Sequence, residues 1–260
     1  MDLPLLTMVA LIGAAFVAGW VDAVVGGGGL IQLPALLIGL PADTPVPSIA
    51  GTNKLSSVAG TATASATYLR TVAVTVASAA PLMACAYIGS TLGARLVHYL
   101  SKDVFTPVVL VALIGVGIYT VRRPTLGVNH ELRDVGPRHY LTLAVIGLVI
   151  GGYDGLIGPG TGTFFVIAMV AMLGYGFLEA SVLAKLANLT TNVAAIVVFI
   201  TSGSIIWKLG LPMAAANLIG GFLGARTAIK FGSAFVRKVF LIVVTILGLR
   251  LAWDTVQMIL

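Results

Sequence analysis

Residues 5–40 of the chain read LLTMVALIGAAFVAGWVDAVVGGGGLIQLPALLIGL. The apolar run 5–25 has the length of about 20 residues that a helix needs to cross the hydrocarbon core of a bilayer. Four glycines interrupt this run, and the apolar run 30–40 that follows them is too short to cross comfortably on its own. The pattern predicts a membrane helix followed by half of a broken or re-entrant helix.

The whole chain has the composition of a membrane protein. Hydrophobic residues make up 58% of the 260 positions and charged residues 9%, against about 45–50% and about 25% in soluble domains. So few charges cannot cover the surface of a soluble fold. The Lys and Arg residues behind the net charge of +6 lie mostly at the ends of apolar runs, where they set orientation. We therefore predict an all-α polytopic membrane protein that does not bind nucleic acid.

Apolar runs and the polar or Pro/Gly breaks between them predict ten segments. Residues 163–174, like residues 30–40, follow a glycine-rich break and are too short for a full crossing. The polar stretch 122–138 reads as a connector with no sign of a soluble domain. The ten segments are 5–25, 30–40, 47–69, 72–99, 103–121, 139–157, 163–174, 179–201, 209–229 and 237–259.

The two halves of the sequence resemble each other. Glycines and charged residues recur in the same order at an offset of 132 residues, which becomes 131 after a one-residue gap. The pattern predicts a first repeat over 1–121, the connector 122–138 and a second repeat over 139–260, each with about four full-length helices and one short one. The matched pairs are Gly19/Gly151, Asp22/Asp154, Gly26/Gly158, Gly28/Gly160, Lys54/Lys185, Leu55/Leu186, Pro81/Pro212 and the Gly-Ala-Arg runs ending at Arg95 and Arg226.

Positive residues at segment ends indicate how the repeats are oriented, because cytoplasmic loops collect Lys and Arg. If each half crosses an odd number of times, one side holds nine of these residues and the other three. An even number gives six on each side. Inverted repeats are therefore favoured, with the connector cytoplasmic and both termini outside, although counting the short helices as re-entrant reverses the parity. The nine are Arg70, Arg122, Arg123, Arg133, Arg138, Arg226, Lys230, Arg237 and Lys238, and the three are Arg95, Lys102 and Lys208.

Two glycine loops stand at matched positions before the two short segments. Glycine permits left-handed backbone and a close approach of a ligand. If a half-helix begins after each loop, its free N–H groups and positive dipole end make an anion site, as in inverted-repeat transporters. The alternative is a close helix crossing built on small residues. The substrate-binding candidates in these loops are Gly26, Gly27, Gly28, Gly29, Gly158, Gly160, Thr161 and Gly162.

Lys54 and Lys185 lie inside membrane segments, where a lysine costs at least about 2.5–3.5 kcal/mol. Hydroxyl and small side chains surround both of them, as they would in a cavity wall. We predict that the two cations hold an anionic substrate; the alternative is that either one snorkels to an interface. The hydrogen-bond donors expected beside them are Asn53, Asn188, Thr191 and Asn192.

Asp22 and Asp154 each precede a glycine loop by four residues. They are expected to act as counter-ions of the two lysines in the empty state, or to carry a coupling proton. Arg95 and Arg226 end long apolar segments and are expected to be interfacial anchors. The three histidines have no metal-ligand spacing and are expected to be solvated, and the single Cys85 excludes an internal disulfide. No catalytic motif appears, so we expect no enzyme, no metal site and no cofactor.

With these residues in place, the chain resembles the TauE/SafE family of sulfite exporters. The resemblance rests on residues 19–36 (GWVDAVVGGGGLIQLPAL), on Gly51-Thr52-Asn53-Lys54, on residues 158–162 (GPGTG) and on both Gly-Ala-Arg runs. It covers residues 8–255. Pro159 departs from the all-glycine first loop, so the two loops are not strict equivalents.

The resemblance implies a multi-pass transporter in the inner membrane of a bacterium or archaeon. Its substrates would be small sulfur-containing anions such as sulfite, sulfoacetate and other organosulfonates. Outward movement of one anion gains about 2.3 kcal/mol per 100 mV when the cell interior is negative, which favours export. The expected partners are the anion and the lipid bilayer, and the sequence allows a homodimer.

Two other functions fit the same residues. One is proton-coupled uptake of an organosulfonate, thiosulfate or carboxylate anion, in which Asp22 and Asp154 would carry the protons. The other is an anion channel, or an accessory subunit without alternating access. The internal repeat argues against the channel, because repeats of this kind are typical of transporters with alternating access.

Overall fold

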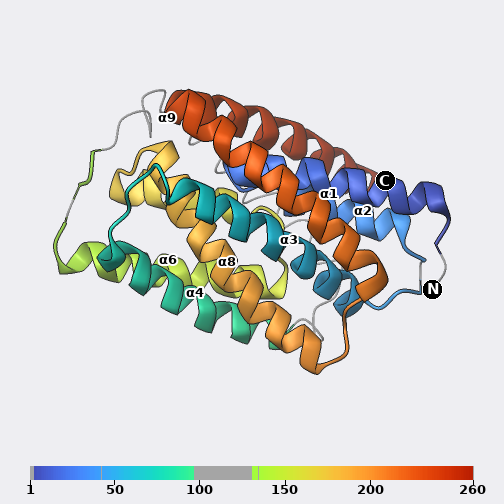
Figure 1. The fold of residues 1–260 in the computed structure, drawn as a ribbon. Coiled ribbons are helices and arrows are strands. Elements are labelled where there is room, and N and C mark those ends of the chain that lie inside the picture. The colour runs from blue at the N-terminus through green and yellow to red at the C-terminus, as the bar shows by residue number, and fades with distance from the viewer. Residues whose placement is uncertain (1–2, 42, 97–130, 134, 260) are drawn as a thin grey trace.

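The computed structural model describes residues 3–41, 43–96, 131–133 and 135–259. Every regular element within these ranges is a helix (Figure 1). In chain order the elements are α1 (Leu5–Val25), α2 (Gly29–Gly39), α3 (Val46–Tyr68), α4 (Val76–Leu96), α6 (Pro137–Leu156), α7 (Thr161–Ala168), the π-helical turn η2 (Met169–Leu173), α8 (Phe177–Thr201) and α9 (Trp207–Ile259).

The predicted segments agree closely with these helices. Segment 5–25 is α1, segment 30–40 is α2 shifted by one residue, and segment 163–174 corresponds to α7 and η2 together. The last two predicted segments both lie in α9, which is interrupted at Gly232, where φ is 71°. The chain turns back at this glycine, so α9 is two helices joined end to end (Figure 1). The predicted segment 103–121 lies outside the described residues.

Proline and glycine mark the helix ends. α6 begins at Pro137, where the N–H that proline lacks would have had no partner within the helix. α1 ends at Val25 because Gly26 adopts the left-handed conformation, with φ of 82°. The Gly26 N–H donates to the carbonyl of Asp22 at 2.8 Å. α7 begins directly after Gly160, which is left-handed too, with φ of 80°.

Four of the described helices, α1, α4, α6 and α8, are long and apolar enough to cross a membrane. The 11 residues of α2 extend only about 16 Å, roughly half of a hydrocarbon core. The 23 residues of α3 are long enough to cross but rich in Ser, Thr and Gly. α3 packs against both α8 and α9, so protein covers much of its polar surface.

Glycines set the close helix crossings and show the direction of each pair. A Cβ at Gly147 or at Gly151 would lie within 2.5 Å of the carbonyl oxygen of Leu82 or Ala86, respectively. Both helices thus advance by four residues, and α4 and α6 run parallel. α1 and α9 run parallel for the same reason, since Gly220 and Gly224 meet the carbonyls of Phe16 and Trp20.

The other contacts fix how α2, α3 and α8 run. Gly28 lies against Ala18 while Gly39 lies against Leu11, so α2 folds back along α1. α3 and α8 run antiparallel. The Nδ2 of Asn192 donates to the Oγ1 of Thr61 at 3.4 Å, and Phe199, later in α8, lies against Gly51, earlier in α3.

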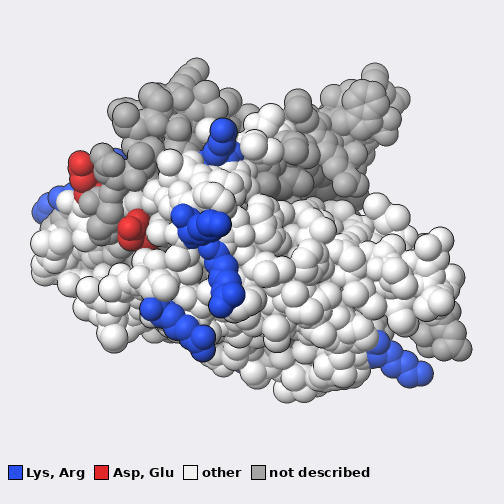
Figure 2. Space-filling model, turned by 45° about the horizontal axis from the view of Figure 1, so that its top comes forward, with Lys and Arg blue, Asp and Glu red and all other residues white. Residues whose placement is uncertain are grey.

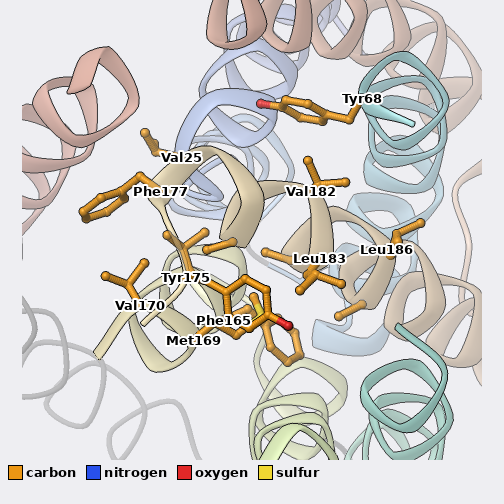
Figure 3. Packing of buried hydrophobic residues seen from close by; sticks show 14 of the residues in the cluster. Val25, Tyr68, Phe165, Met169, Val170, Tyr175, Phe177, Val182, Leu183 and Leu186 are labelled. Carbon is orange, nitrogen blue, oxygen red and sulfur yellow. The ribbon is translucent and has the colours of Figure 1, made fainter. Parts of the chain in front are cut away.

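The largest apolar core surrounds α7, η2 and the first half of α8. Figure 3 shows Phe165 and Met169 in the middle of this core, with Val170 on one side, Leu183 of α8 on the other and Tyr68 of α3 at the top. The phenolic hydroxyl of Tyr68, whose ring is fully buried, donates to the carbonyl of Ala23 at 2.8 Å. This core fixes the end of α1 and the start of α7 relative to each other.

The outer surface is mostly uncharged. In Figure 2 the visible face is largely white, and most of its charged side chains lie toward the end at which α3 finishes and α6 begins. Large apolar side chains such as Leu6, Ile38 and Val149 are exposed. An apolar belt of this kind fits a chain surrounded by lipid.

Candidate functional site

The two glycine loops touch each other inside the helix bundle. A Cβ at Gly26 would lie 2.2 Å from the carbonyl carbon of Gly162, which no side chain could occupy without moving the backbone. The Thr163 N–H donates to the carbonyl of Gly26 at 3.2 Å, and the Thr163 hydroxyl donates to the carbonyl of Val25 at 3.0 Å. The end of α1 is therefore attached directly to the start of α7.

The second loop is held by its own hydrogen bonds. Gly158 and Gly160 have φ of 91° and 80°. The Tyr153 hydroxyl donates to the carbonyl of Pro159 at 2.7 Å, and the Thr161 hydroxyl donates to the carbonyl of Gly158 at 2.6 Å. The first loop has a single left-handed residue, Gly26, so the two loops differ in conformation as well as in sequence.

The charged residues form two ion pairs that link the halves of the chain. Lys54 Nζ lies 2.5 Å from the Asp154 carboxylate, and Lys185 Nζ lies 2.6 Å from the Asp22 carboxylate. In each pair the lysine comes from one half and the aspartate from the other. The two charges of a pair offset each other's cost of burial in the bundle.

A small cavity of about 30 Å³ lies between the loops and the ion pairs. A cavity needs about 10–15 Å³ to hold one water molecule, so this one has room for about two. Residues from α1, α2, α3, α6, α7 and α8, or from the loops between them, reach it. Its lining residues are Asp22, Gly26, Gly29, Asn53, Lys54, Ser57, Asp154, Gly158, Thr161, Gly162, Asn188 and Asn192.

Most of the residues predicted from sequence meet at this cavity, but five do not line it: Gly27, Gly28, Gly160, Lys185 and Thr191. Lys185 is fully buried and reaches the cavity only through Asp22. Gly28 packs against Ala18 and donates its N–H to Asp22 Oδ1 at 3.4 Å. Gly160 lies against Leu30, and the Gly27 carbonyl accepts the Leu30 N–H at 3.1 Å.

The carboxylate of Asp22 shows what the site can hold. One of its oxygens accepts from Lys185 Nζ at 2.6 Å, and the other is 3.4 Å from the N–H of Gly28, at the N-terminus of α2. A half-helix N-terminus and a buried ammonium both favour negative charge. The site therefore already binds one anionic group, which belongs to the protein itself.

A polar network that the sequence analysis missed supports the cavity from the α2 side. The amide nitrogen of Gln32 donates to Asn53 Oδ1 at 2.9 Å, and its amide oxygen accepts from Ser56 at 3.1 Å and from Asn217 at 2.9 Å. All four side chains are buried. The signal was present in the sequence, because Gln32 is the single polar side chain in an apolar half-helix.

Ser57, which lines the cavity, was also missed, although the offset of 131 residues pairs it with Asn188. Asn188 lies against Gly162, whose added Cβ would be 2.7 Å from the Asn188 amide nitrogen. The carbonyl of Thr191 accepts from Ser90 at 2.8 Å, and Thr191 is buried away from the cavity lining. Thr191 therefore joins α8 to α4.

The prediction that the histidines are solvated was wrong for His139. Its ring is 2% exposed, and Nε2 lies 3.0 Å from the Tyr175 hydroxyl, which donates to Ser78 at 3.2 Å. His98 and His130 lie outside the described residues. Among the described residues, no group of three or more His, Cys, Asp or Glu side chains is placed to hold a metal ion.

A membrane-embedded helical bundle with a buried, charged cavity between two broken helices defines a transport protein of the polytopic class. The family described as "Sulfite exporter TauE/SafE" matches residues 11–251. The chain belongs to this family of membrane transporters, which are not enzymes.

Named relatives agree with the class. The chain is 35% identical to the "Probable membrane transporter protein ORF9" of Sinorhizobium sp, over 97% of this chain and 95% of that protein. It is 33% identical to a "Probable membrane transporter protein" of Haemophilus influenzae, over 98% of each chain. It is 32% identical to the "Probable membrane transporter protein YfcA" of Escherichia coli K12, over 93% of this chain and 88% of that protein. No solved structure matches this chain significantly.

Proposed function

We propose that this transporter moves small sulfur-containing anions, such as sulfite or an organosulfonate, out of the cell across the inner membrane. The observation that carries the proposal is the Asp22 carboxylate, held between Lys185 and the N-terminus of α2. A sulfite or sulfonate group presents anionic oxygens to the same donors. The family description supports the sulfur chemistry, while the names of the relatives say only that they are transporters.

Binding requires a change at the cavity. About 30 Å³ holds water but not an anion with its own oxygens, and both lysines are already neutralised. We infer that the anion takes the place of a carboxylate beside Lys54 or Lys185 while the glycine loops separate. In this arrangement Asp22 and Asp154 hold the positions beside the two lysines that the anion would take.

Two inverted repeats would supply the alternating access. The helices that the sequence repeat pairs, α3 and α8, run antiparallel, as the contacts of Thr61 with Asn192 and of Gly51 with Phe199 require. The contact of α1 with α9 also corresponds to that of α6 with α4, and both pairs run parallel. An inverted pseudo-two-fold relation predicts both features.

The charged end of the molecule supports the orientation. The described positive residues at the end where α6 begins include Arg133, Arg138, Arg226 and Lys230, and this end would face the cytoplasm together with the connector 122–138. Export of the anion would then start from this end.

Direct binding tests the proposal. Purified protein would be titrated with sulfite, thiosulfate, sulfate, sulfoacetate, taurine and chloride, with the unfolding temperature as the readout. We expect one sulfur anion to raise this temperature, and the shift to disappear in Lys54→Gln and Lys185→Gln while both variants remain in the membrane. Unchanged affinity in both variants would reject the site, and no shift with any anion would reject the substrate class.

The ion pairs also favour a second function, proton-coupled uptake. An anion that displaces the Asp22 or Asp154 carboxylate leaves that carboxylate without its cation, and a bound proton would neutralise it. Anion and proton would then enter together. In proteoliposomes, Asp22→Asn should stop concentrative uptake driven by a pH gradient but spare anion exchange. Loss of both activities, or of neither, would argue against this coupling.

A further inference from the structure

A second site lies on the outside of the bundle, separate from the cavity between the ion pairs. A groove of about 650 Å³ runs between α1 and α9. Its floor is apolar, and two cations stand beside it. The lining residues are Phe16, Val17, Trp20, Leu223, Arg226, Thr227, Lys230 and Phe231.

The groove has an apolar end and a charged end. Phe16 lies opposite Gly220 and Trp20 opposite Gly224. The apolar end of the groove therefore lies along the stretch where α1 and α9 pack together. Arg226 and Lys230 follow the first residue of α9, Trp207, by 19 and 23 positions, or about 29 and 35 Å along a helix. They therefore stand where α9 reaches the interface, at the end proposed to be cytoplasmic.

The two cations are free to bind an anion. Both side chains are exposed, and the ion pairs that form among the described residues are those of Lys54 and Lys185. The Arg226 guanidinium stacks over the ring of Phe222 at 4.3 Å, a contact that orients the group and leaves its charge unpaired. Thr227, which also lines the groove, donates its hydroxyl to the Leu223 carbonyl at 2.7 Å.

We propose that this groove binds an anionic phospholipid of the cytoplasmic leaflet. The phosphate lies between Arg226 and Lys230, and one acyl chain lies along Phe16, Val17 and Leu223, with Trp20 at its side. Charge selects the lipid, because basic residues at this depth attract anionic headgroups. The apolar floor favours a lipid over free phosphate, because only an acyl chain can cover the floor and remove its apolar surface from water.

The site would link the lipid to the transport machinery. Trp20 belongs to the same helix as Asp22, two residues away, and a Cβ at Gly224 would lie 2.5 Å from the carbonyl of Trp20. A lipid that lies in the groove over this helix pair therefore touches the helix that carries one carboxylate of the central site.

Fluorescence quenching tests the proposal in the intact chain. Trp20 would be kept as the single tryptophan by Trp207→Phe and Trp253→Phe, in nanodiscs of phosphatidylcholine containing increasing brominated phosphatidylglycerol. We expect saturable quenching at a low fraction of the anionic lipid, and none beyond bulk contact with brominated phosphatidylcholine. Equal quenching by both lipids would overturn the proposal.

Charge variants locate the headgroup. The double variant Arg226→Gln with Lys230→Gln should lower the affinity for the anionic lipid about 30-fold, if each basic residue contributes about 1 kcal/mol. The change is read from the fraction of anionic lipid that gives half-maximal quenching. Arg95→Gln, at the matched position of the other half and outside the groove, is the control and should leave it unchanged. Inorganic phosphate should not compete at millimolar concentration. Unchanged binding in the double variant, full competition by phosphate, or occupation of the groove by a second copy, seen as a doubled mass, would each reject the proposal.

Discussion

The two ion pairs are made of the same groups but differ in their access to the cavity. In the Lys54–Asp154 pair both side chains are nearly sealed, with 6% and 4% of their surface exposed. In the Lys185–Asp22 pair the lysine is sealed at 1%, while 17% of the Asp22 side chain is exposed. Asp22 is therefore the carboxylate that water, a proton or a substrate can approach first.

Their surroundings differ in the same sense. Beside α2, the buried amide of Gln32 connects Asn53, Ser56 and Asn217. At the offset of 132 residues the counterpart of Gln32 is Phe164, and α7 packs into the apolar core (Figure 3). Both halves thus contribute polar side chains to the cavity, but the buried amide network behind it lies on the α2 side, whereas α7 packs into apolar side chains. The comparison teaches that two segments of similar sequence can carry the same charged pair in different surroundings.

The largest effect is expected where the two loops meet. Gly26→Ala places a Cβ 2.2 Å from the backbone of Gly162, at a φ of 82° that alanine rarely adopts. We expect a loss on the order of 4 kcal/mol or more, seen as failure to recover monodisperse protein. Gly162→Ala meets Gly26 at 2.5 Å without the positive φ and should be milder. Gly13→Ala is the control, because Gly13 also lies in α1 and a Cβ added there would have no atom within 4 Å. Equal yields of all three would show that the loops separate freely.

The ion pairs should respond unequally to loss of their lysines. Lys54→Gln strands the sealed Asp154 and should cost about 3–5 kcal/mol. Lys185→Gln strands Asp22, which water reaches, and should cost less. Unfolding temperatures in detergent would measure the difference. The double variant Lys54→Gln with Asp154→Asn should recover most of the loss, because no charge is left buried alone. If the two single variants are equally unstable, the greater exposure of Asp22 does not lower the cost of leaving its carboxylate unpaired.

The polar network should matter in the first half alone. Gln32→Met keeps the side-chain length but leaves Asn53 Oδ1 and the Ser56 hydroxyl without their partner, at about 1–3 kcal/mol for each group left unsatisfied, while Asn217 still donates to the Ala15 carbonyl. The matched change Phe164→Met, which exchanges one apolar side chain for another, should cost less than about 1.5 kcal/mol. Thermal unfolding ranks the two. A smaller effect of Gln32→Met would mean that water replaces the amide and that the asymmetry is only superficial.

The smallest effect is expected at the two tyrosines that anchor the loops. Tyr68→Phe removes the hydrogen bond to Ala23, and Tyr153→Phe removes the one to Pro159. Each should cost about 1 kcal/mol, with Tyr68 the larger because its ring is fully buried. Chemical denaturation in mild detergent can resolve this difference. A larger loss in Tyr153→Phe would indicate that the second loop, with its two left-handed glycines, depends more on its anchor.

Much of the fold follows from the sequence alone, because a bilayer imposes simple rules on it. An apolar run of about 20 residues must form a helix in lipid, since every backbone N–H and C=O needs a partner within the segment. Residues 5–25 became α1 without a shift, and the four glycines ended it where the left-handed Gly26 lies. The lysines stood out in the same way, because a cation inside such a run is costly unless something pairs with it.

Only the tertiary structure decided which groups pair. Sequence order places Asp22 nearer to Lys54, yet each lysine pairs with the aspartate of the other half, because α1 and α7 meet at Gly26 and Gly162. It also decided that Lys185 is sealed behind Asp22, and that His139, at a predicted segment end, is buried against Tyr175. Such contacts depend on how helices from distant parts of the chain pack. Hydropathy, which reports the transfer of single residues from water to lipid, carries no information about that packing.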